Sequence, residues 1–449
     1  MKNRFFLSLA LLGMCTMNAM AGTGDLNDDG QLNVGDVATL YGAILVGDNN
    51  SKYDLNLDNQ VNVGDVATLY QYIINGVPDD PAPEYLVGGD ISMLNKYLDA
   101  GAHYNDADSN YIKDPLPWFG QAAGWNAMRV RLFVNPANAT DAQKKEGVVQ
   151  DLDYVVKLGK QIKDAGYQFA LDLHYSDTWA DPGKQNIPAE WKSIATVNGL
   201  ADKVYSYTTE VLQTLKAAGA TPDLVQTGNE ITYGMLWPTG HVYADGGAQA
   251  GGSWDYFMLY LNAAAKAVRE QCPKAKLILH VEMARNTNPA AFFKTADGRN
   301  ADYDVIGLSY YPSYHGAPGV LDNVLTTLET EHAGKEIMIM ETGYGAQWEL
   351  PDAKYWYTTA NKQPYWPLEG DKTWNASGAG QLQFTKDLIA LCKKHESVKG
   401  IFWWWPEANE YWVNWQTPVT GSWYNATMFN NYTGKPFPAL FELQTFLER

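Results

Sequence analysis

Short apolar runs alternate with amphipathic stretches from Tyr85 to the end of the chain, and this pattern limits the possible fold more than any other feature of the sequence. Eight runs of strand length occur there: YLVGGDISML (85–94), AMRVRLFVNP (127–136), QFALDLHYSD (168–177), DLVQTGNE (223–230), LILHVEM (277–283), VIGLSYYP (305–312), IMIMETGYG (337–345) and IFWWWPE (401–407). Stretches with helical periodicity lie between several of them, at 148–165, 197–218, 254–271 and 380–394. Strands that alternate with helices pair in parallel, and eight such units close into a barrel. We therefore predict the α/β class, with a (β/α)₈ TIM barrel at residues 86–449.

A duplicated segment precedes the predicted barrel. The sequence DLNDDGQLNVGDVATLYGAIL begins at Asp25, and its copy DLNLDNQVNVGDVATLYQYII begins at Asp54. Each copy has oxygen-bearing side chains at positions 1, 3, 5, 9 and 12 and a backbone carbonyl at position 7, which is the ligand spacing of a calcium loop. The predicted calcium ligands are Asp25, Asn27, Asp29, Gln31 and Asp36 in the first copy and Asp54, Asn56, Asp58, Gln60 and Asp65 in the second, with Asn33 and Asn62 at position 9. An apolar helix follows each loop, so we predict a small all-α calcium domain at residues 22–75.

The two loops together resemble a type I dockerin, which pairs two calcium loops with Asp at position 12. The resemblance implies calcium as a structural ligand and a cohesin as a protein partner. Positions 10 and 11, where dockerins often carry partner-recognising hydroxyl groups, are Val34-Gly35 and Val63-Gly64 in this chain. A stabilising or spacing role for the small domain is therefore an alternative to partner binding.

Residues 1–21 have the pattern of a secretory signal peptide. Two basic residues precede an apolar run that is too short to span a membrane, and the small-residue site Ala19-Met20-Ala21 follows. Cys15 permits a second interpretation, that of a lipidated lipoprotein. We expect a secreted, periplasmic or cell-surface protein without a transmembrane helix. A linker rich in Pro and Asp, at 76–85, connects the two predicted domains.

The formal net charge of −18 restricts the possible partners. It argues against nucleic acids and anionic membrane surfaces, because both repel an acidic protein. Aromatic residues make up 13% of the chain, and we expect some of these rings to be surface platforms rather than core. Beyond the leader, Cys272 and Cys392 lie near the ends of two helices that are not neighbours in sequence, so we predict buried free thiols. We expect a monomer.

Polar and aromatic residues occur where nearly every predicted strand ends. These residues are Asp90, Arg129, Arg131, Asp172, His174, Asn229, Glu230, His280, Glu282, Tyr310, Tyr311, Glu341 and Trp404. The carboxyl ends of the strands in such a barrel face the active site. A purely structural barrel would not need acids, bases and rings at so many strand ends, so the pattern predicts an enzyme.

Glu230 and Glu341 are distinctive because they end the fourth and seventh strands, which lie across the barrel mouth from each other. Two such carboxyl groups can hydrolyse a glycosidic bond, since one protonates the leaving oxygen while the other attacks the anomeric carbon. A separation of roughly 5–5.5 Å gives retention of configuration and one of roughly 6.5–9.5 Å gives inversion. A salt bridge at a strand end is the alternative for either residue alone. Glu282 and Asp172 each lie near a His, and we expect them to have supporting roles.

Several longer segments resemble the endo-β-1,4-galactanases of glycoside hydrolase family 53. They are TGNEITYGMLWPTG, LDLHYSDTWADPGKQ, AMRVRLFVNP, SYYPSY and METGYG, and the resemblance extends over roughly residues 86–447. The family consists of retaining enzymes, so the resemblance implies Glu230 as acid/base and Glu341 as nucleophile, without a cofactor for catalysis. It also implies galactan as the substrate and a set of substrate-binding residues: Arg129, His174, Asp177, Trp179, Asp181, Asn229, Trp237, His280, Tyr310 and Trp404.

Within that set, the implied roles have a physical basis. An arginine beside Glu341 lowers the pKa of its carboxyl group. An amide such as Asn229 can bind the sugar 2-hydroxyl more strongly in the transition state. Trp404 offers a flat platform for a sugar ring, and Trp237 offers a ring contact further along the cleft.

The chain departs from the family at two points. Trp405 stands where the family usually has the Glu of a Trp-Glu-Pro sequence. The segment GAQWELPDAKYWYTT after Glu341 lacks the Asp-rich stretch through which some bacterial members bind calcium, so the resemblance does not carry that calcium site over to this chain.

Two other functions remain as alternatives. The first is a related barrel hydrolase that acts on another β-linked polysaccharide, such as mannan or arabinan. The second is a glycan-binding protein without catalysis, which predicts the loss of one carboxylate, whereas both are present.

Overall fold

The computed structural model describes the following residues: 24–27, 31–56, 60–75, 82–283, 288–346, 374, 377–414, 417–420 and 427–449. The chain divides into two compact units, Met1–Pro83 and Glu84–Arg449, and each is considered by itself. The predicted leader with Cys15 lies outside the described residues, as does most of the predicted linker. In the described ranges, no helix is both long enough and apolar enough to cross a membrane.

The first unit contains one helix in each copy of the sequence repeat, α1 (Val34–Val46) and α2 (Val63–Asn75), with a short 3₁₀ turn, η1 (Ser51–Tyr53), between them. Apolar side chains from both copies form its core, with Leu40 and Leu69 fully buried at equivalent positions. Helix α1 begins at Val34 because the Asn33 side chain accepts a hydrogen bond from the Gly35 N–H and caps the first turn. The repeat in sequence is therefore a repeat in structure.

The carboxyl groups at loop position 12 are bonded to their own loops. Asp36 Oδ1 accepts the Leu26 N–H at 2.7 Å and Asp36 Oδ2 accepts the Asn33 N–H at 2.9 Å. Asp65 repeats the first bond in the second copy, with the Leu55 N–H at 2.8 Å. Position 5 of each loop, Asp29 or Asp58, lies outside the described residues. Among the residues that are described, no group of three or more His, Cys, Asp or Glu side chains could hold a metal ion. The calcium ligands and the dockerin-like assignment therefore stay predictions.

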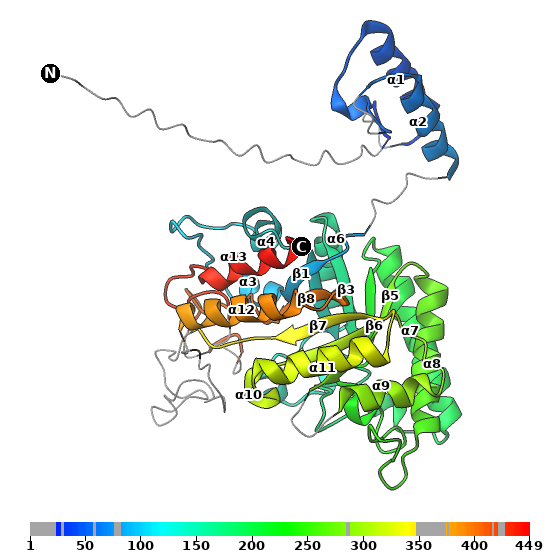
Figure 1. Ribbon diagram of the computed structural model, residues 1–449, viewed down its shortest axis with the longest axis vertical. Coiled ribbons are helices and arrows are strands. Elements are labelled where there is room, and N and C mark those ends of the chain that lie inside the picture. The colour runs from blue at the N-terminus through cyan, green and yellow to red at the C-terminus, as the bar shows by residue number, and fades with distance from the viewer. Residues whose placement is uncertain are drawn as a thin grey trace, which may run out of the picture. The chain divides into compact units, whose positions relative to one another are not determined.

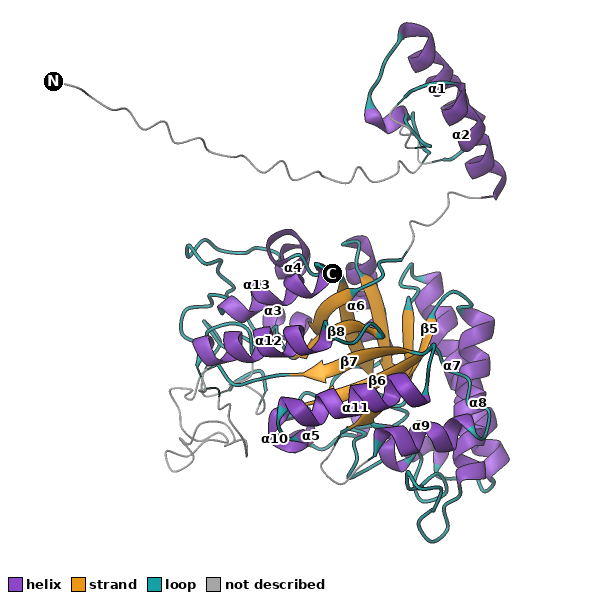
Figure 2. Cartoon of the chain, in the orientation of Figure 1, coloured by secondary structure: helices purple, strands orange, loops and turns teal. Residues whose placement is uncertain are grey.

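The second unit is a closed barrel of eight parallel strands in sequential order (Figures 1 and 2). The strands are β1 (Leu86–Asp90), β2 (Ala127–Leu132), β3 (Gln168–Leu173), β4 (Leu224–Thr227), β5 (Lys276–Glu282), β6 (Val305–Tyr310), β7 (Glu336–Thr342) and β8 (Val398–Trp404). Strand β1 pairs with both β2 and β8, which closes the ring. The predicted TIM barrel is confirmed.

Helices surround the strands, as Figure 2 shows. They are α3 (Leu94–Asp99), α4 (Pro115–Ala123), α5 (Asp141–Lys145), α6 (Leu152–Asp164), α7 (Val197–Ala217), α8 (Trp254–Gln271), α9 (Pro289–Asp297), α10 (Pro312–His315), α11 (Pro318–Glu331), α12 (Gly378–Cys392) and α13 (Pro438–Glu442), with the 3₁₀ turns η2 (Pro136–Asn138), η3 (Ala189–Trp191), η4 (Ile231–Tyr233) and η6 (Leu443–Leu447).

The predicted helices agree with α6, α7, α8 and α12 apart from their ends. Helix α6 begins four residues later than predicted, because the Asp151 carboxylate accepts the Tyr154 N–H and caps the first turn there. Cys272 and Cys392 are buried free thiols, as predicted.

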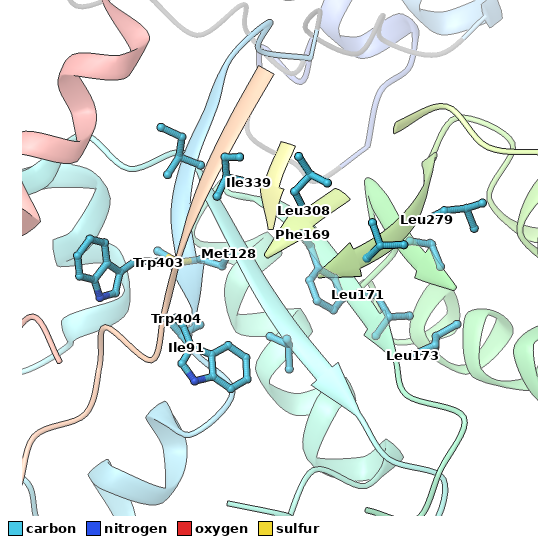
Figure 3. Packing of buried hydrophobic residues seen from close by; sticks show 14 of the residues in the cluster. Ile91, Met128, Phe169, Leu171, Leu173, Leu279, Leu308, Ile339, Trp403 and Trp404 are labelled. Carbon is cyan, nitrogen blue, oxygen red and sulfur yellow. The ribbon is translucent and has the colours of Figure 1, made fainter. Parts of the chain in front are cut away.

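Alternate residues of each strand face two different environments. Outward-facing side chains such as Met128, Leu171 and Leu308 pack in the large apolar cluster between strands and helices (Figure 3). Inward-facing side chains form a second, smaller cluster, which includes Leu86, Ala127, Ala170, Leu224, Ile278, Val305, Met338, Met340 and Phe402. Further along the same strands, the inward positions change to charged and polar residues. The interior therefore has an apolar floor below a polar mouth.

A β-bulge in β7 determines which way Glu341 points. Leu308 pairs with Ile339, but the next residue, Ser309, pairs with Glu341, so Met340 is an extra residue in β7. Met340 belongs to the inward cluster, and strict alternation would then turn Glu341 outward. The extra residue restores Glu341 to the inward side, beside Ser309.

Candidate active site

A pocket of about 570 Å³ opens at the carboxyl ends of the strands. Carboxyl groups and aromatic rings dominate its wall, which consists of Glu146, Trp179, Ala180, Asp181, Pro182, Lys184, Asn229, Glu230, Tyr233, Glu282, Tyr311, Tyr314, His315, Glu341, Trp404 and Trp405. The volume lies within the usual range for small-molecule sites and is sufficient for sugar rings. Both carboxyl groups that the sequence singled out, Glu230 and Glu341, line it.

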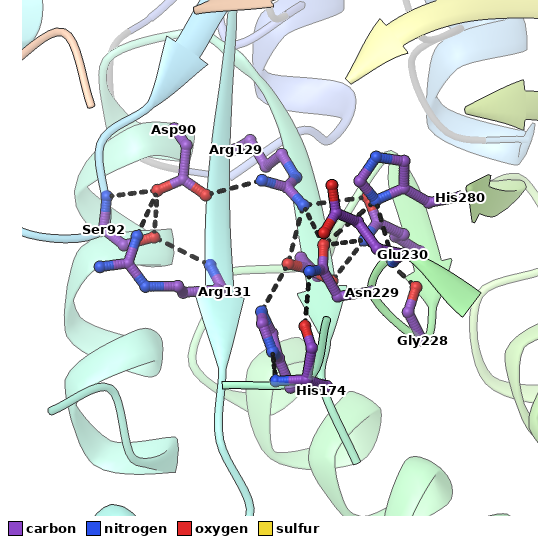
Figure 4. A network of polar contacts seen from close by, with 12 residues as sticks. Asp90, Ser92, Arg129, Arg131, His174, Gly228, Asn229, Glu230 and His280 are labelled. Atoms are coloured by element: carbon purple, nitrogen blue, oxygen red, sulfur yellow. Dashed lines mark hydrogen bonds and ion pairs between the residues drawn. The ribbon is translucent and has the colours of Figure 1, made fainter. Parts of the chain in front are cut away.

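Arg129 lies beneath this pocket and joins the acidic residues around it (Figure 4). Its guanidinium group contacts Asp90 at 3.0 Å, Asp172 at 2.8 Å and Glu341 at 3.0 Å, and its side chain is fully buried. One nitrogen, Nη2, also donates to Asn229 Oδ1 at 3.0 Å. Although burial favours the neutral form, the three carboxylates raise the pKa of Arg129, so it stays charged. The site is thus organised around one fixed positive charge.

Arg131, two residues along β2, organises the aromatic wall. It donates to Asp90 Oδ1 at 3.0 Å, beside Ser92 in Figure 4. Its guanidinium carbon lies 4.7 Å from the centre of the Trp179 ring, 4.9 Å from that of Trp405 and 5.2 Å from that of Trp404. Such cation–π contacts hold aromatic rings in place. The three tryptophans that line the pocket are therefore oriented by a buried cation.

Glu341 is fixed at both carboxylate oxygens. Oε1 is 3.0 Å from Arg129 Nη2, and Oε2 accepts the Tyr311 hydroxyl at 3.0 Å. Burial raises the pKa of Glu341 to about 7, although Arg129 and the Tyr311 hydroxyl oppose that rise. Arg129 lowers the pKa of this carboxyl group, as expected from the sequence, but desolvation outweighs the arginine, so the net change is a rise.

Glu230 has an unusual backbone conformation and a more strongly perturbed carboxyl group. Its φ of +46° and ψ of +51° are left-handed values, which cost a non-glycine residue about 1–3 kcal/mol and are concentrated at functional sites. Burial, the charge of Glu341 and the charge of Glu282 raise the pKa of Glu230 well above its usual value. Because Arg129 contacts Glu341 and favours its ionised form, and because the Glu341 charge in turn opposes ionisation of Glu230, Glu341 ionises first. Paired carboxyl groups with separated pKa values are the usual arrangement for acid and nucleophile.

His280 connects Glu230 to the buried network from below. Its Nδ1 lies 3.1 Å from Asn229 Oδ1, and its Nε2 lies 2.8 Å from Ser309 Oγ, whose hydroxyl also hydrogen-bonds the Glu230 carboxyl group. Burial and the charge of Arg129 lower the pKa of His280 well below its usual value, so its ring is neutral. It supports Glu230 without adding a charge.

Replacing Tyr311 by Phe is expected to shift the acidic limb of the pH–rate profile to higher pH, by about one pH unit. The Tyr311 hydroxyl stabilises ionised Glu341, and a hydrogen bond to a charged group contributes about 1.5 kcal/mol or more. Without it, Glu341 stays protonated to higher pH, and activity is lost sooner on acidification. The measurement is kcat/KM against pH. Tyr233→Phe, which removes another pocket hydroxyl, is the control, and an unmoved acidic limb in Tyr311→Phe would contradict this account.

The predicted substrate-binding residues fall into three groups. Those that line the pocket are Trp179, Asp181, Asn229 and Trp404. Those buried beneath it are Arg129, His174 and His280. His174 Nδ1 accepts the Ala180 N–H at 3.1 Å, which leaves Nε2 as the protonated nitrogen beside Asp172. Each of these three buried residues contacts a residue of the pocket wall.

The third group of predicted residues lies away from the pocket and consists of Tyr310, Trp237 and Asp177. Tyr310 follows inward-facing Ser309 in β6 and so points away from the barrel, where its hydroxyl donates to the Gly316 carbonyl at 3.1 Å. The next residue, Tyr311, faces inward and lines the pocket.

Contacts with other loop residues hold the other two. Trp237 stacks on His241, with ring centres 3.8 Å apart and planes within 4°. Asp177 Oδ2 accepts hydrogen bonds from Asn138 Nδ2 and the Ala189 N–H, each at 2.9 Å. Asp177 therefore ties loops together.

Sequence reasoning missed several residues of the pocket wall. Tyr311 was among the strand-end residues but was not assigned to substrate binding, although its position one residue past Tyr310 offered that signal. Trp405 was recognised only as a departure from the family. Glu146 comes from the loop after β2, and no feature of the sequence indicated it.

The model of "Glycosyl hydrolase family 53" matches residues 86–443. An arabinogalactan endo-beta-1,4-galactanase of Cellvibrio japonicus is 34% identical over 338 residues, which cover 73% of this chain and 81% of that protein. A probable arabinogalactan endo-beta-1,4-galactanase A of Aspergillus fumigatus is 31% identical over 332 residues, which cover 71% and 83%. The solved catalytic domain of an Ignisphaera aggregans family 53 hydrolase superposes with a TM-score of 0.68 at 28% identity, over 83% of this chain and 98% of that one.

Proposed function

The chain belongs to glycosyl hydrolase family 53, and from that premise we propose that it is an endo-β-1,4-galactanase that cleaves the galactan chains of pectin and type I arabinogalactan with retention of configuration. As a member of this family, it is a glycoside hydrolase. The observation that carries the proposal is the pair of carboxyl groups, Glu230 after β4 and Glu341 in β7, that line one pocket above Arg129. Hydrolysis by two carboxyl groups requires no cofactor.

Glu341 is the nucleophile in this proposal, and Glu230 is the acid and then the base. In the first step, a carboxylate oxygen of Glu341 bonds to the anomeric carbon, the glycosidic bond breaks, and Glu230 gives its proton to the leaving oxygen. In the second step, Glu230 takes a proton from water, which attacks the anomeric carbon and releases Glu341. The order of the two pKa values supports this assignment, since Glu230 holds its proton at a pH where Glu341 is ionised.

Four side chains of the pocket wall bind the sugar at the cleavage point in this proposal. One amide N–H of Asn229 donates to the Ala180 carbonyl at 2.9 Å, which leaves the second for the sugar 2-hydroxyl. Trp404 and Trp179 provide apolar faces for sugar rings. Asp181, which is held by Lys184 at 3.2 Å, provides an acceptor for a sugar hydroxyl.

The choice of galactan rests on the names of the relatives, and a related hydrolase acting on mannan or arabinan is the competing function. A panel of linear β-1,4-galactan, mannan and arabinan, incubated with wild type and with Glu341→Ala, separates the two. We expect short galactose oligomers from galactan with wild type alone. Failure of wild type to release sugar from galactan, or full activity of the variant, would overturn the proposal.

We further propose that calcium stabilises the N-terminal repeat. The support is the ligand spacing in both sequence copies and the equivalent placement of Asp36 and Asp65. An ion that binds only the folded form protects it from proteolysis. Residues 25–75 should therefore be cleaved faster in chelator, while activity on galactan persists. An unchanged cleavage pattern would disprove the calcium assignment.

A further inference from the structure

Three aromatic rings from two distant parts of the sequence form a stack outside the pocket. His103 and Tyr111 lie between α3 and α4, in the connection from β1 to β2, and Trp412 lies in the loop after β8. The His103 ring centre is 4.1 Å from that of Tyr111, with planes 24° apart, and 4.1 Å from that of Trp412, with planes 27° apart. Two rings at this distance cannot share one face of an imidazole, so His103 lies between the other two.

The outer rings of the stack are open to solvent. Trp412 is 67% exposed and Tyr111 is 56% exposed, although His103 covers one face of each. These are the two most exposed large hydrophobic side chains among the described residues of the barrel unit. A folding chain gains little by placing a tryptophan there, and clustered exposed aromatic surface usually marks a binding site.

Hydrogen bonds between the two loops fix the stack. The His103 N–H donates to the Tyr411 carbonyl at 2.9 Å, and the Asn409 side chain donates to the His103 carbonyl at 3.2 Å. Trp412 itself has a φ of +71°, a strained value that persists only where the surroundings impose it. The rings are therefore arranged before a ligand arrives, which reduces the entropy lost on binding.

The stack is built from two connections that start at the same end of the barrel as the pocket. Strands β1 and β8 are neighbours, and both connections leave their carboxyl ends. The loop after β8 also supplies Trp405 to the pocket wall, whereas neither Tyr111 nor Trp412 contributes to that wall. A polysaccharide chain is long enough to reach beyond one pocket, so the stack is accessible to the polymer that the pocket cleaves.

We propose that Tyr111, His103 and Trp412 form a second sugar-binding platform, which holds a β-1,4-galactan chain at a point outside the catalytic pocket. The flat, apolar faces match the C–H face of a pyranose ring, and a neutral sugar needs no counter-charge from the protein. The inference rests on the proposed function for the identity of the polymer.

Binding of linear β-1,4-galactan to Glu341→Gln, which leaves the polymer intact, is the test. We expect Trp412→Ala and Tyr111→Ala, each placed in that background, to bind galactan about tenfold more weakly. Trp412→Phe keeps a ring in the stack and should lose much less. Tyr256→Ala, which removes an exposed ring from α8, is the matched control and should bind as the parent does. Thermal unfolding confirms that each variant is folded.

Binding of galacto-oligosaccharides of increasing length shows whether the platform holds the same galactan chain as the pocket or a separate one. If one chain spans pocket and platform, the effect of Trp412→Ala appears above a certain oligomer length. If a separate chain binds, the effect appears with polymer only, and either result supports the platform. Equal galactan affinity in the folded parent, Trp412→Ala and Tyr111→Ala overturns it. Failure of wild type to hydrolyse galactan overturns the proposed function instead, because the binding comparison does not depend on turnover.

Discussion

Replacing Glu341 by Ala is expected to lower kcat/KM on galactan by roughly 10⁴-fold or more, because no other group can form the covalent intermediate. Azide should restore part of the activity toward an aryl β-galactobioside with a good leaving group. The anion can enter the space left by the side chain, where Arg129 would be close to it, and attack the anomeric carbon from the side that Glu341 occupied. The product is then the α-galactosyl azide, and nuclear magnetic resonance of the product identifies it.

Glu230→Ala is the matched variant, and its azide product should have the opposite configuration. With a good leaving group, the intermediate on Glu341 still forms, although no acid is present. Azide then replaces the water that Glu230 would have activated, and it attacks from the other side to give the β-galactosyl azide. If the configurations were exchanged between the two variants, the roles of the two residues would be exchanged as well. Wild-type activity in either variant would refute the two-carboxylate mechanism.

Strand periodicity predicts where the strands of this barrel lie, but it does not predict the direction of every side chain. All eight strands were located because a parallel barrel strand is a short apolar run between helices, a local property. The side of the sheet to which Glu341 points cannot be predicted from the local sequence of β7. It depends on the extra residue, Met340, whose presence follows from pairing with β6. The position of Glu341 at the end of the seventh strand and the family resemblance both pointed to this residue, whereas strict alternation along β7 would have turned it away from the pocket.

Tyr310 and Trp237 do not line the pocket, and the physical reasons differ. Tyr310 follows an inward-facing residue in a regular strand, so alternation applied strictly would have excluded it. Trp237 sits in a long loop, where stacking on His241 decides its position and no periodicity exists.

The pKa of Glu341 was beyond sequence reasoning as well, since it reflects the balance between complete burial and one arginine. The stack of Tyr111, His103 and Trp412 joins residues about 300 positions apart and follows only from the closure of the barrel between β1 and β8.

Replacing Arg129 by Met is expected to destabilise the barrel by about 3–5 kcal/mol and to abolish most of the activity. The variant leaves Asp90, Asp172 and Glu341 in a buried cluster without their shared counter-charge, and breaking a buried ion pair by removing one partner has a cost of that size. Urea unfolding followed by tryptophan fluorescence measures it. All 16 tryptophans lie after residue 83, so the signal reports the barrel unit alone.

The unfolding free energy lost in Arg129→Met should be smaller at acidic pH than at neutral pH. Burial raises the pKa of Asp172, but Arg129 and His174 lower it by more, so the pKa is lower in the folded protein than in the unfolded chain. In wild type, ionised Asp172 therefore stabilises the fold at any pH above its unfolded pKa. This stabilisation is lost as the pH falls through the lower pKa of the folded state. Met at position 129 removes that contribution at neutral pH. It can remove little once Asp172 is protonated in wild type as well, so the deficit should shrink as the pH falls below about 4. Arg269→Met is the matched control: Arg269 also pairs with two aspartates, Asp302 and Asp304, but it is 31% exposed, and exposed pairs contribute about 0–1 kcal/mol. Equal destabilisation by both substitutions, or a deficit at position 129 that grows on acidification, would show that Arg129 does not neutralise this acidic cluster.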